Sequence, residues 1–549
     1  MKEILADLLK NKLKLSKKEI ESSIEIPSNP ELGDYAFPTF ILAKQFKKSP
    51  NEIASNLAKE LGKKLPAEIE RVISNGPYIN FFIDNKMFAE KTLSRACSPE
   101  FGQGKENGKI LVEHTSVNPN ASPHVGRARN SIIGDSIVRI LKFRGNKVKI
   151  HYYVNDVSKQ IAMLALVFKP KDNFSSMLGN YIKISKKVAD NPELEKKVFE
   201  LLEKFESKDK KIVELFRQIV DTCVEGQKKI FASFGIEFDN FDYESRYVGK
   251  PSKDLLERFK KTGKLFEDDE GRLVLDQKNT PVIHKMKAPV FVLARSNGTG
   301  LYGLRDIAYT IDKLKNGRNL IVLGEDQKLY FEQICEALKL LGYPSPESVH
   351  YSFVLIQTDR GAAKMSTRRG ELVLLEEFFD EAVKKAKSEV KKRNTKGDPI
   401  KIALGAIKFS MLKNDNNKNI IFDWKNSLSF DGESGPYLQY SYARASSILR
   451  KSKKKIKNYK IIKLEHHETE LVKKIAEFPD IVKSAAEKLS PNLIANYSFQ
   501  LAQTFNEFYH SCPVIGNENE DFRLKLVEAF AQTLKNSLNL LGIEVMDEM

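Results

Sequence analysis

Two short polar segments carry the residue types that could do chemistry on a nucleoside polyphosphate. They are PHVGR at 123–127 and KMSTRRG at 364–370. His124 supplies an N–H donor, while Arg127 and Lys364 supply cations. Such groups can stabilise the negative charge that develops on a leaving pyrophosphate. Either segment alone could be an ordinary solvated loop, but the pair predicts a site for ATP-like phosphates.

The elements that must position His124 can be expected from residues 109–141. Residues 110–112 form a short apolar run suited to a central strand, and apolar residues then recur at three- and four-residue spacing from 125 to 141, as in a helix. A helix N-terminus carries free N–H groups and positive dipole, so polyphosphate is its natural ligand. An alternating strand at 147–154 completes a β-α-β unit. The alternative is a nucleotide-free β-α-β unit with a surface histidine.

Further strand patterns at 273–275, 290–294 and 319–323 are interpreted as the second half of the same parallel sheet. The charged stretch between the two halves is mostly helical and is expected as an insertion at about 160–270. We therefore predict a doubly wound, Rossmann-like catalytic domain over 108–375, with ligands at the carboxyl ends of its strands.

The rest of the chain predicts a multidomain α/β protein. Residues 1–100 look like a small α+β domain, with strand character from 72 to 83. Residues 376–435 are a basic, helical linking region. From 436 to 549 the pattern is helical almost throughout, which predicts an all-α bundle.

The charge balance favours a polyanionic partner such as nucleic acid. The 549 residues contain 90 Lys plus Arg against 73 Asp plus Glu, a formal charge of +17. The alternative is a lysine-rich surface that reflects a biased genome.

Cysteine spacing and hydropathy indicate the compartment. The four cysteines lie far apart without paired metal spacing, which favours a reducing cytoplasm and predicts no metal site of the protein's own. Nowhere do eighteen apolar residues run together, so neither secretion nor a membrane partner is expected.

The two polar segments resemble the signatures of a known family. PHVGR is similar to the HIGH motif of class I aminoacyl-tRNA synthetases, and KMSTR is similar to their KMSKS loop. VEHTSVNP at 112–119, YGLRD at 302–306 and QYSYAR at 439–444 are similar to arginyl-tRNA synthetases in particular. The resemblance covers nearly the whole chain in the family's order.

Two positions depart from the family pattern. Arg127 stands where the first motif usually has its second histidine, and Arg368 stands where the loop usually has its second lysine. Both replacements keep a cationic donor, although the two side chains differ in geometry from those they replace.

The resemblance implies the site residues. The catalytic residues would be His124, Arg127, Lys364 and Arg368, and ATP would be bound by His124, Gly126, Arg127, Lys364, Met365 and Ser366. Arginine would be bound by Glu113, Ser116, Asn118, Tyr302, Asp306 and Gln327. A guanidinium is planar and always charged, so a pocket with carboxylates and an aromatic face suits it. Without the resemblance, Asp306 could equally cap its helix or pair with Arg305.

The same resemblance implies the contacts with tRNA. Asn75, Tyr78 and Asn80 match the segment that contacts the D-loop, although a plain hairpin edge is the alternative. Gln439, Tyr440 and Arg444 lie in an aromatic and basic stretch suited to the unpaired bases of an anticodon loop. About half of the tyrosines in this stretch are expected in the bundle core instead.

The implied activity is that of an arginine–tRNA ligase. It would activate L-arginine with ATP, with Mg²⁺ accompanying the nucleotide, and transfer the arginyl group to the 3′-terminal ribose of tRNA(Arg). A cytoplasmic monomer is expected.

Three alternatives remain open from the sequence: a class I synthetase for another amino acid, a tRNA-binding paralogue without catalysis, and an NAD-dependent oxidoreductase. The last rests on Gly298, Gly300 and Gly303, which fit a G-x-G-x-x-G pattern, with Glu325 some twenty residues on.

Overall fold

The structure is a computed structural model that describes residues 1–549 except 28, 297, 359–360, 365–372, 453, 455 and 457–458. The chain forms two compact units. The first comprises Met1–Phe101, Ala445–Phe478 and Leu501–Leu534, and the second comprises Gly102–Arg444, Pro479–Gln500 and Lys535–Met549.

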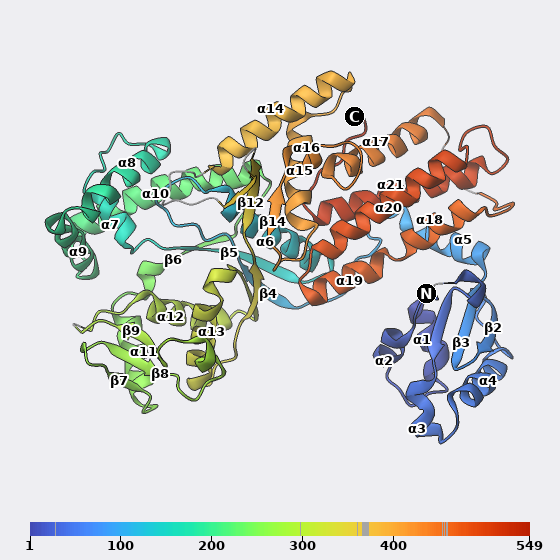
Figure 1. The fold of residues 1–549 in the computed structure, drawn as a ribbon, viewed down its shortest axis with the longest axis horizontal. Coiled ribbons are helices and arrows are strands. Elements are labelled where there is room, and N and C mark those ends of the chain that lie inside the picture. Colours follow the sequence, from blue (N-terminus) through green and yellow to red (C-terminus); the bar gives the residue numbers. More distant parts are fainter. Residues whose placement is uncertain are drawn as a thin grey trace. The chain divides into compact units, whose positions relative to one another are not determined.

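A five-stranded parallel sheet forms the centre of the second unit (Figure 1). Its order is β11-β10-β4-β5-β6, and every neighbouring pair is parallel. The chain builds outward from β4 to one edge and then returns to build β10 and β11 on the other side, so the order reverses between β4 and β10. Ligands on such sheets bind beside the reversal point, at the carboxyl ends of the strands. The bounds are β4 (Lys109–Glu113), β5 (Lys147–Val154), β6 (Asn240–Tyr243), β10 (Arg318–Gly324) and β11 (Glu347–Tyr351).

Helix α6 (Val125–Phe143) follows β4 as the apolar spacing predicts. Its apolar side chains are buried, including Ile132, Ile133 and Ile137. Burial of this face holds the N-terminus of α6 at the carboxyl edge of the sheet. Helices α12 (Tyr302–Leu314) and α13 (Lys328–Leu340) flank β10 in the sequence.

The strands expected at 273–275 and 290–294 do not join the parallel sheet, and that interpretation is wrong. They are β8 (Leu273–Asp276) and β9 (Val290–Ala294), which form a separate antiparallel sheet with β7 (Leu265–Glu267). Phe259 of α11 (Lys250–Lys260) belongs to the core of this subdomain. Short apolar strands carry no periodicity that distinguishes parallel from antiparallel pairing.

Four helices form the insertion: α7 (Lys159–Ala165), α8 (Phe174–Ala189), α9 (Pro192–Glu206) and α10 (Lys210–Ser233). Side chains of Asn173, Asn191 and Asp209 cap the last three by accepting backbone N–H bonds. The chain then returns to the central sheet at β6, so the inserted helices end well before residue 270. After β11 a small sheet of β12 (Val354–Thr358), β13 (Gly361–Lys364) and β14 (Ile420–Phe422) forms, with α14 (Leu375–Arg393), α15 (Pro399–Leu412) and α16 (Trp424–Ser427).

The first unit begins with a small α+β module. Its antiparallel sheet has the order β1-β3-β2, with bounds Tyr35–Pro38, Tyr78–Ile83 and Ile69–Asn75 respectively. Its helices are α1 (Lys2–Lys10), α2 (Lys17–Ser23), α3 (Ala43–Phe46), α4 (Pro50–Leu61) and α5 (Asn85–Ala96). Gly76, at φ 55°, makes the turn that joins β2 to β3.

The carboxyl-terminal region is helical, as its pattern predicts. Its helices are α17 (Gly435–Ser452), α18 (His466–Ala476), α19 (Phe478–Lys488), α20 (Asn492–Ser511) and α21 (Glu520–Leu540). Among the described residues, no helix combines the length and apolar character needed to cross a membrane.

Candidate active site

The loop after β4 is held in an unusual backbone conformation. Thr115 and Ser116 have φ of 73° and 42°, a left-handed region that costs free energy for residues other than glycine. Asn130 of α6 compensates, because its Oδ1 accepts a 2.6 Å hydrogen bond from the Thr115 N–H and its Nδ2 donates to the Val322 carbonyl at 2.8 Å. The loop is thereby tied both to α6 and to β10.

His124 stands at the N-cap of α6, where the sequence places it. Its Nδ1 is buried and has no hydrogen-bond partner among the described residues. Burial, and then the positive charge of Arg127, lower the pKa of His124 to about 4. The imidazole is therefore neutral at physiological pH and can act as a hydrogen-bond donor. A Cβ on Gly126 would lie 3.0 Å from the His124 ring, so glycine lets the ring lie against the start of the helix.

The segment that returns from the second motif lies beside the first. Leu374 forms an antiparallel bridge with His124, the Val125 N–H donates to the Val373 carbonyl at 3.1 Å, and the Leu375 N–H donates to the Pro123 carbonyl at 2.8 Å. Before the motif, β13 ends at Lys364, paired with β12. The expected ligands Met365, Ser366 and Arg368 lie outside the described residues.

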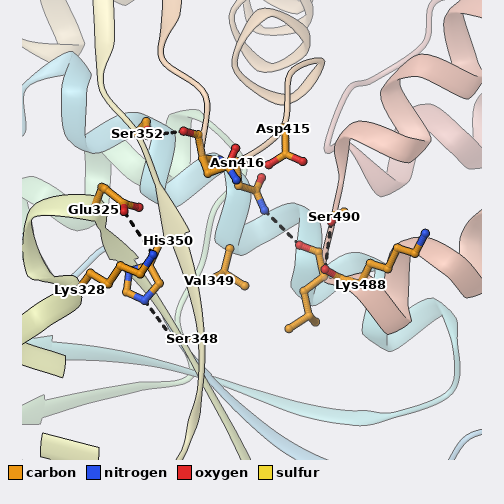
Figure 2. Close-up of a pocket in the computed structure, with 12 residues that line it drawn as sticks. Glu325, Lys328, Ser348, Val349, His350, Ser352, Asp415, Asn416, Lys488 and Ser490 are labelled. Carbon is orange, nitrogen blue, oxygen red and sulfur yellow. Dashed lines mark hydrogen bonds and ion pairs between the residues drawn. The ribbon is translucent and has the colours of Figure 1, made fainter. Parts of the chain in front are cut away.

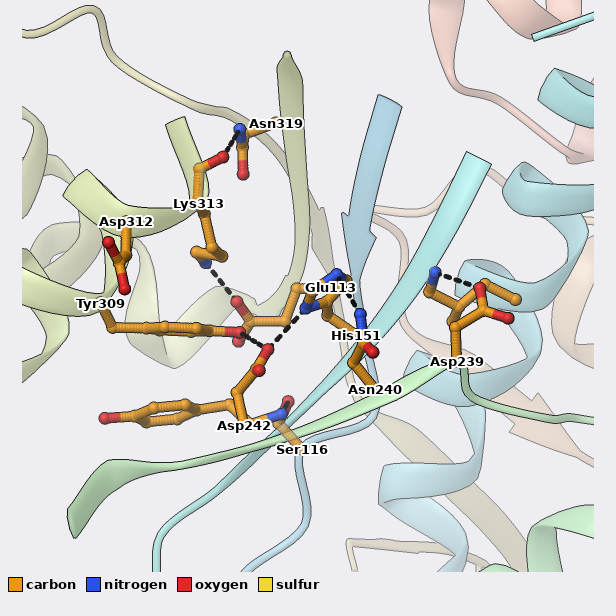
Figure 3. Close-up of polar contacts among 12 residues, drawn as sticks. Glu113, Ser116, His151, Asp239, Asn240, Asp242, Tyr309, Asp312, Lys313 and Asn319 are labelled. Atoms are coloured by element: carbon orange, nitrogen blue, oxygen red, sulfur yellow. Dashed lines mark hydrogen bonds and ion pairs between the residues drawn. The ribbon is translucent and has the colours of Figure 1, made fainter. Parts of the chain in front are cut away.

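Glu113, at the end of β4, already has a cationic partner. Its carboxylate forms a buried ion pair with the Nζ of Lys313 on α12 (Figure 3). The Nζ also lies 4.2 Å from the centre of the Tyr309 ring. Glu113 is only 4% exposed, so its carboxylate is paired with a cation from within the protein.

The carboxylate of Asp306 lies among aromatic side chains. The Tyr330 hydroxyl donates a 2.5 Å hydrogen bond to its Oδ2. Burial raises the pKa of Asp306, the Tyr330 hydrogen bond opposes that shift, and the charge of Glu113 adds to it. Tyr302, one turn earlier on α12, is 55% exposed, and its ring lies 5.2 Å from the Tyr330 ring. Tyr330 thus contacts both the carboxylate of Asp306 and the ring of Tyr302.

The pairing of Asp306 with Arg305, considered from the sequence, does not occur. The Nε of Arg305 lies 2.6 Å from a carboxylate oxygen of Glu244, which is itself buried. Burial raises the pKa of Glu244, and Asp306 and Asp156 raise it further. Carboxylates thus crowd this region, and an additional cation would relieve their mutual repulsion.

A second buried network lies beside the ion pair. Oδ2 of Asp242 is 2.5 Å from the His151 Nδ1 and accepts a 2.9 Å hydrogen bond from the Tyr309 hydroxyl (Figure 3). Burial alone would raise the pKa of Asp242, but the hydrogen bond and charge of His151 outweigh it and lower the value. This network fixes Tyr309 against Lys313.

The three remaining expected arginine ligands lie at the carboxyl ends of β4 and β10. Ser116 Oγ accepts a 3.1 Å hydrogen bond from the Tyr153 N–H. Asn118 is exposed, and its Nδ2 donates to Gln160 Oε1 at 3.0 Å. Gln327 ends the 3₁₀ helix η5 (Glu325–Gln327) directly after β10.

Three residues of this site were missed by the sequence analysis: Tyr153, Lys313 and Tyr330. Burial, and then the charge of Asp306, raise the pKa of Tyr153 well above its usual value, so the hydroxyl stays protonated. Lys313 lies seven residues after Asp306 on the same helix, a spacing that could have suggested a shared face. The sequence carries no signal for Tyr330.

The glycine pattern at 298–303 is not a dinucleotide-binding turn. It follows β9 of the antiparallel sheet, and Gly300 bridges back to Ala294. A Cβ on Gly303 would lie 2.6 Å from the Phe291 ring, so close helix-to-sheet packing explains that glycine. The glycine pattern therefore gives no support to the alternative of an NAD-dependent oxidoreductase.

The expected D-loop contacts differ in accessibility. Asn75 is exposed at the end of β2, and Tyr78 is partly exposed, with its ring edge-on to Phe40 at 5.8 Å. Asn80 is only 2% exposed in the central strand β3, so its assignment as an RNA contact is corrected.

The expected anticodon-loop contacts in α17 also differ in accessibility. Gln439 is fully buried, and its Nε2 donates to the carbonyls of Lys401 at 3.0 Å and Glu544 at 2.8 Å. Its predicted contact with RNA is therefore corrected to a structural role. Tyr440 and Arg444 are partly exposed, and the guanidinium carbon of Arg444 lies 4.9 Å from the centre of the Tyr440 ring.

A separate polar cavity of about 560 Å³ lies beside the edge strand β11 (Figure 2). Its lining includes Glu325, His350, Asp415, Asn416 and Lys488, and no residue expected to bind ATP or arginine is among the described residues that line it. We assign it no role. Within the part of the chain that the structure describes, no group of three or more His, Cys, Asp or Glu side chains could hold a metal ion.

Three family models match successive segments of the chain. Residues 93–424 match the model described as tRNA synthetases class I (R), catalytic domain. Residues 438–549 match the DALR anticodon binding domain, and residues 1–83 match the arginyl tRNA synthetase N terminal domain.

Individual proteins of this kind are also similar to the chain. The arginine–tRNA ligase of Methanocaldococcus jannaschii is 36% identical over 97% of this chain and 96% of its own length. That of Clostridium perfringens is 35% identical over the full length of both. The solved structure of Thermus thermophilus arginyl-tRNA synthetase is 28% identical with a TM-score of 0.82, covering 100% of this chain and 99% of that one.

Proposed function

The chain belongs to the arginyl-tRNA synthetase family, and on that premise we propose how its own residues join L-arginine to tRNA(Arg). In the first step a carboxylate oxygen of arginine attacks the α-phosphorus of ATP, which forms arginyl-adenylate and releases pyrophosphate. In the second step a 3′-terminal ribose hydroxyl of the tRNA attacks the carbonyl carbon of the adenylate, and AMP leaves.

The observation that carries the choice of substrate is the environment of Asp306. A half-buried carboxylate beside an exposed tyrosine face, in a region crowded with further carboxylates, suits a permanently charged, planar guanidinium. Asp306 accepts the guanidinium N–H bonds, and Tyr302 covers its face. Ser116 and Asn118 bind the amino-acid end of arginine, and Gln327 makes a further contact with it. Glu113, whose charge acts on Asp306, provides the second carboxylate for the guanidinium.

ATP lies over the N-terminus of α6. His124 donates a hydrogen bond to the phosphates as a neutral imidazole, and Gly126 leaves room for them. Arg127 and the loop residues Lys364, Met365, Ser366 and Arg368 gather around the phosphates and stabilise the leaving pyrophosphate. Mg²⁺ bound with ATP would further neutralise the charge of the phosphates. Positioning and electrostatic stabilisation supply the acceleration, so no covalent enzyme intermediate is needed.

The tRNA is held by the two ends of the chain. Residues 1–100 contact the D-loop through Asn75 and Tyr78, while residues 436–549 contact the anticodon loop with Tyr440 and Arg444. Residues 108–375 carry out both chemical steps, and residues 376–435 connect them to the anticodon-binding helices. The formal charge of +17 attracts the RNA. The protein works as a monomer in the cytoplasm.

The test is aminoacylation of total tRNA with each of the twenty labelled amino acids in turn, in the presence of ATP and Mg²⁺. Labelling by arginine alone is expected, and ATP–pyrophosphate exchange is expected to require bound tRNA. Labelling by a different amino acid would overturn the substrate assignment. No labelling by folded protein that still bound tRNA would instead indicate a paralogue without catalysis.

A further inference from the structure

Gln227, on helix α10 of the insertion, is bonded to the loop that leads into the first signature. Its Nε2 donates to the Asn118 carbonyl at 3.0 Å and to the Ala121 carbonyl at 2.9 Å. The side chain is 1% exposed. One amide group thus ties down two carbonyls of a segment that has no regular secondary structure of its own.

Tyr152 of β5 completes this support from the sheet. Its hydroxyl oxygen accepts a 3.0 Å hydrogen bond from the Val117 N–H and lies 2.8 Å from Gln227 Oε1. Tyr152 is buried, and burial raises the pKa of its hydroxyl, which therefore stays protonated and can donate to Gln227. Tyr152 and Gln227 together bond to three residues of the loop, Val117, Asn118 and Ala121.

The packing of the insertion brings α10 close enough for this contact. A Cβ on Gly226 would lie 2.1 Å from the Phe174 ring at the start of α8, so only glycine allows α8 and α10 this approach. A second contact from the insertion reaches the same loop, because Gln160 Oε1 of α7 accepts from Asn118 Nδ2 at 3.0 Å. The helical insertion is therefore built against the loop rather than standing apart from it.

We infer that Gln227 is a positioning residue for the reaction: it holds Asn118 and the approach to His124 in the geometry that arginine and ATP require. This inference rests on the proposed function. It assigns the insertion a part in catalysis although none of its residues need touch a substrate. Displacement of reacting groups by about 1 Å can cost about 100-fold in rate, so a mobile loop would be sufficient to slow the reaction.

The test compares two methionine substitutions on the same helix. Gln227→Met keeps the length of the side chain but removes both donated hydrogen bonds, and Gln218→Met changes an exposed glutamine that bonds only within α10, to Glu214. We expect Gln227→Met to lower kcat/KM for arginine by about tenfold or more, with its affinity for tRNA unchanged in filter binding. Gln218→Met should remain within about twofold of the unmodified protein.

A double-mutant cycle with Tyr152→Phe separates positioning from general loss of stability. Because both side chains hold one loop, the fold-loss of the double variant should be smaller than the product of the two single losses. A fold-loss in the double variant equal to the product of the two single losses would overturn the inference. A Gln227→Met variant as active as Gln218→Met would overturn it as well. Inactivity of the unmodified protein with arginine would instead overturn the proposed function, so the two failures are distinguishable.

Discussion

The Tyr330 hydroxyl donates a hydrogen bond to Oδ2 of Asp306, across 2.5 Å between helices α13 and α12. These helices lie on either side of β10 in the sequence, so the contact fixes the carboxylate at the carboxyl edge of the sheet. Burial raises the pKa of Asp306, and the Tyr330 hydroxyl stabilises its charged form. The contact therefore favours a charged Asp306 at this edge of the sheet.

Asp306→Asn should raise the Michaelis constant for arginine by about 10- to 100-fold, because a charge-assisted hydrogen bond contributes about 1.5–3 kcal/mol. Turnover at saturating arginine should change less. Asp312→Asn, on an exposed face of the same helix, is the matched control. Steady-state aminoacylation measures both quantities, and an unaltered Michaelis constant in Asp306→Asn would contradict the assignment.

Stability should respond to the protonation of His124. Its folded pKa of about 4 lies below the ordinary value of 6.5, so between these pH values the unfolded chain binds a proton that the folded site does not. Stability therefore rises with pH across that range and is constant above it. His114, whose pKa burial lowers to about 3, acts in the same direction in every variant compared.

We expect His124→Gln to lose less thermal stability than the unmodified protein when the pH falls from about 7.5 to about 5. Thermal unfolding without ligands at the two pH values is the measurement. Equal losses in the two proteins would show that the imidazole is not held neutral.

The buried pair of Glu113 and Lys313 should be costly to break. Lys313→Met leaves a carboxylate without its cation and should lower the free energy of unfolding by about 3–5 kcal/mol. The double variant Glu113→Gln with Lys313→Met should recover part of that loss. Urea unfolding provides the comparison, with the exposed Lys315→Met as control. A single variant as stable as the control would refute this role of the pair.

Two helical glycines should respond to alanine in opposite directions. A Cβ on Gly134 of α6 would lie 2.3 Å from the buried His114 ring, whereas a Cβ on Gly179 of α8 would meet nothing within 4 Å. Gly134→Ala should therefore destabilise the protein by about 1–3 kcal/mol, and Gly179→Ala should stabilise it by about 0.5–1 kcal/mol. Thermal unfolding measures the stability of both variants. An unchanged stability in Gly134→Ala would mean that the His114 ring can move away.

The elements with a long or strictly periodic pattern could be predicted without coordinates. The β4-α6-β5 unit follows from alternation and helical spacing, and the carboxyl-terminal helices follow from spacing alone. The second half of the sheet could not be predicted in the same way. The strands at 273–276 and 290–294 are short apolar runs, and only the pairing of β8 with β7 and of β9 with β8 shows that they are antiparallel.

The candidate site, too, could be predicted from the sequence only in part. The sequence motifs and their spacing placed His124 at a helix N-terminus and Asp306 one turn after Tyr302. They could not show that Lys313 neutralises Glu113, or that Asn80 and Gln439 are buried, because those facts depend on residues distant in the chain.

The sequence by itself determined the motifs, the helical and strand periods and the excess of positive charge, since each is a property of neighbouring residues or of composition. The tertiary structure alone decided which cation Glu113 pairs with, which amides are buried, and which helix supports the signature loop. Hydrogen bonds such as those of Gln227 to the Asn118 and Ala121 carbonyls join segments more than a hundred residues apart, and only folding brings their atoms within reach.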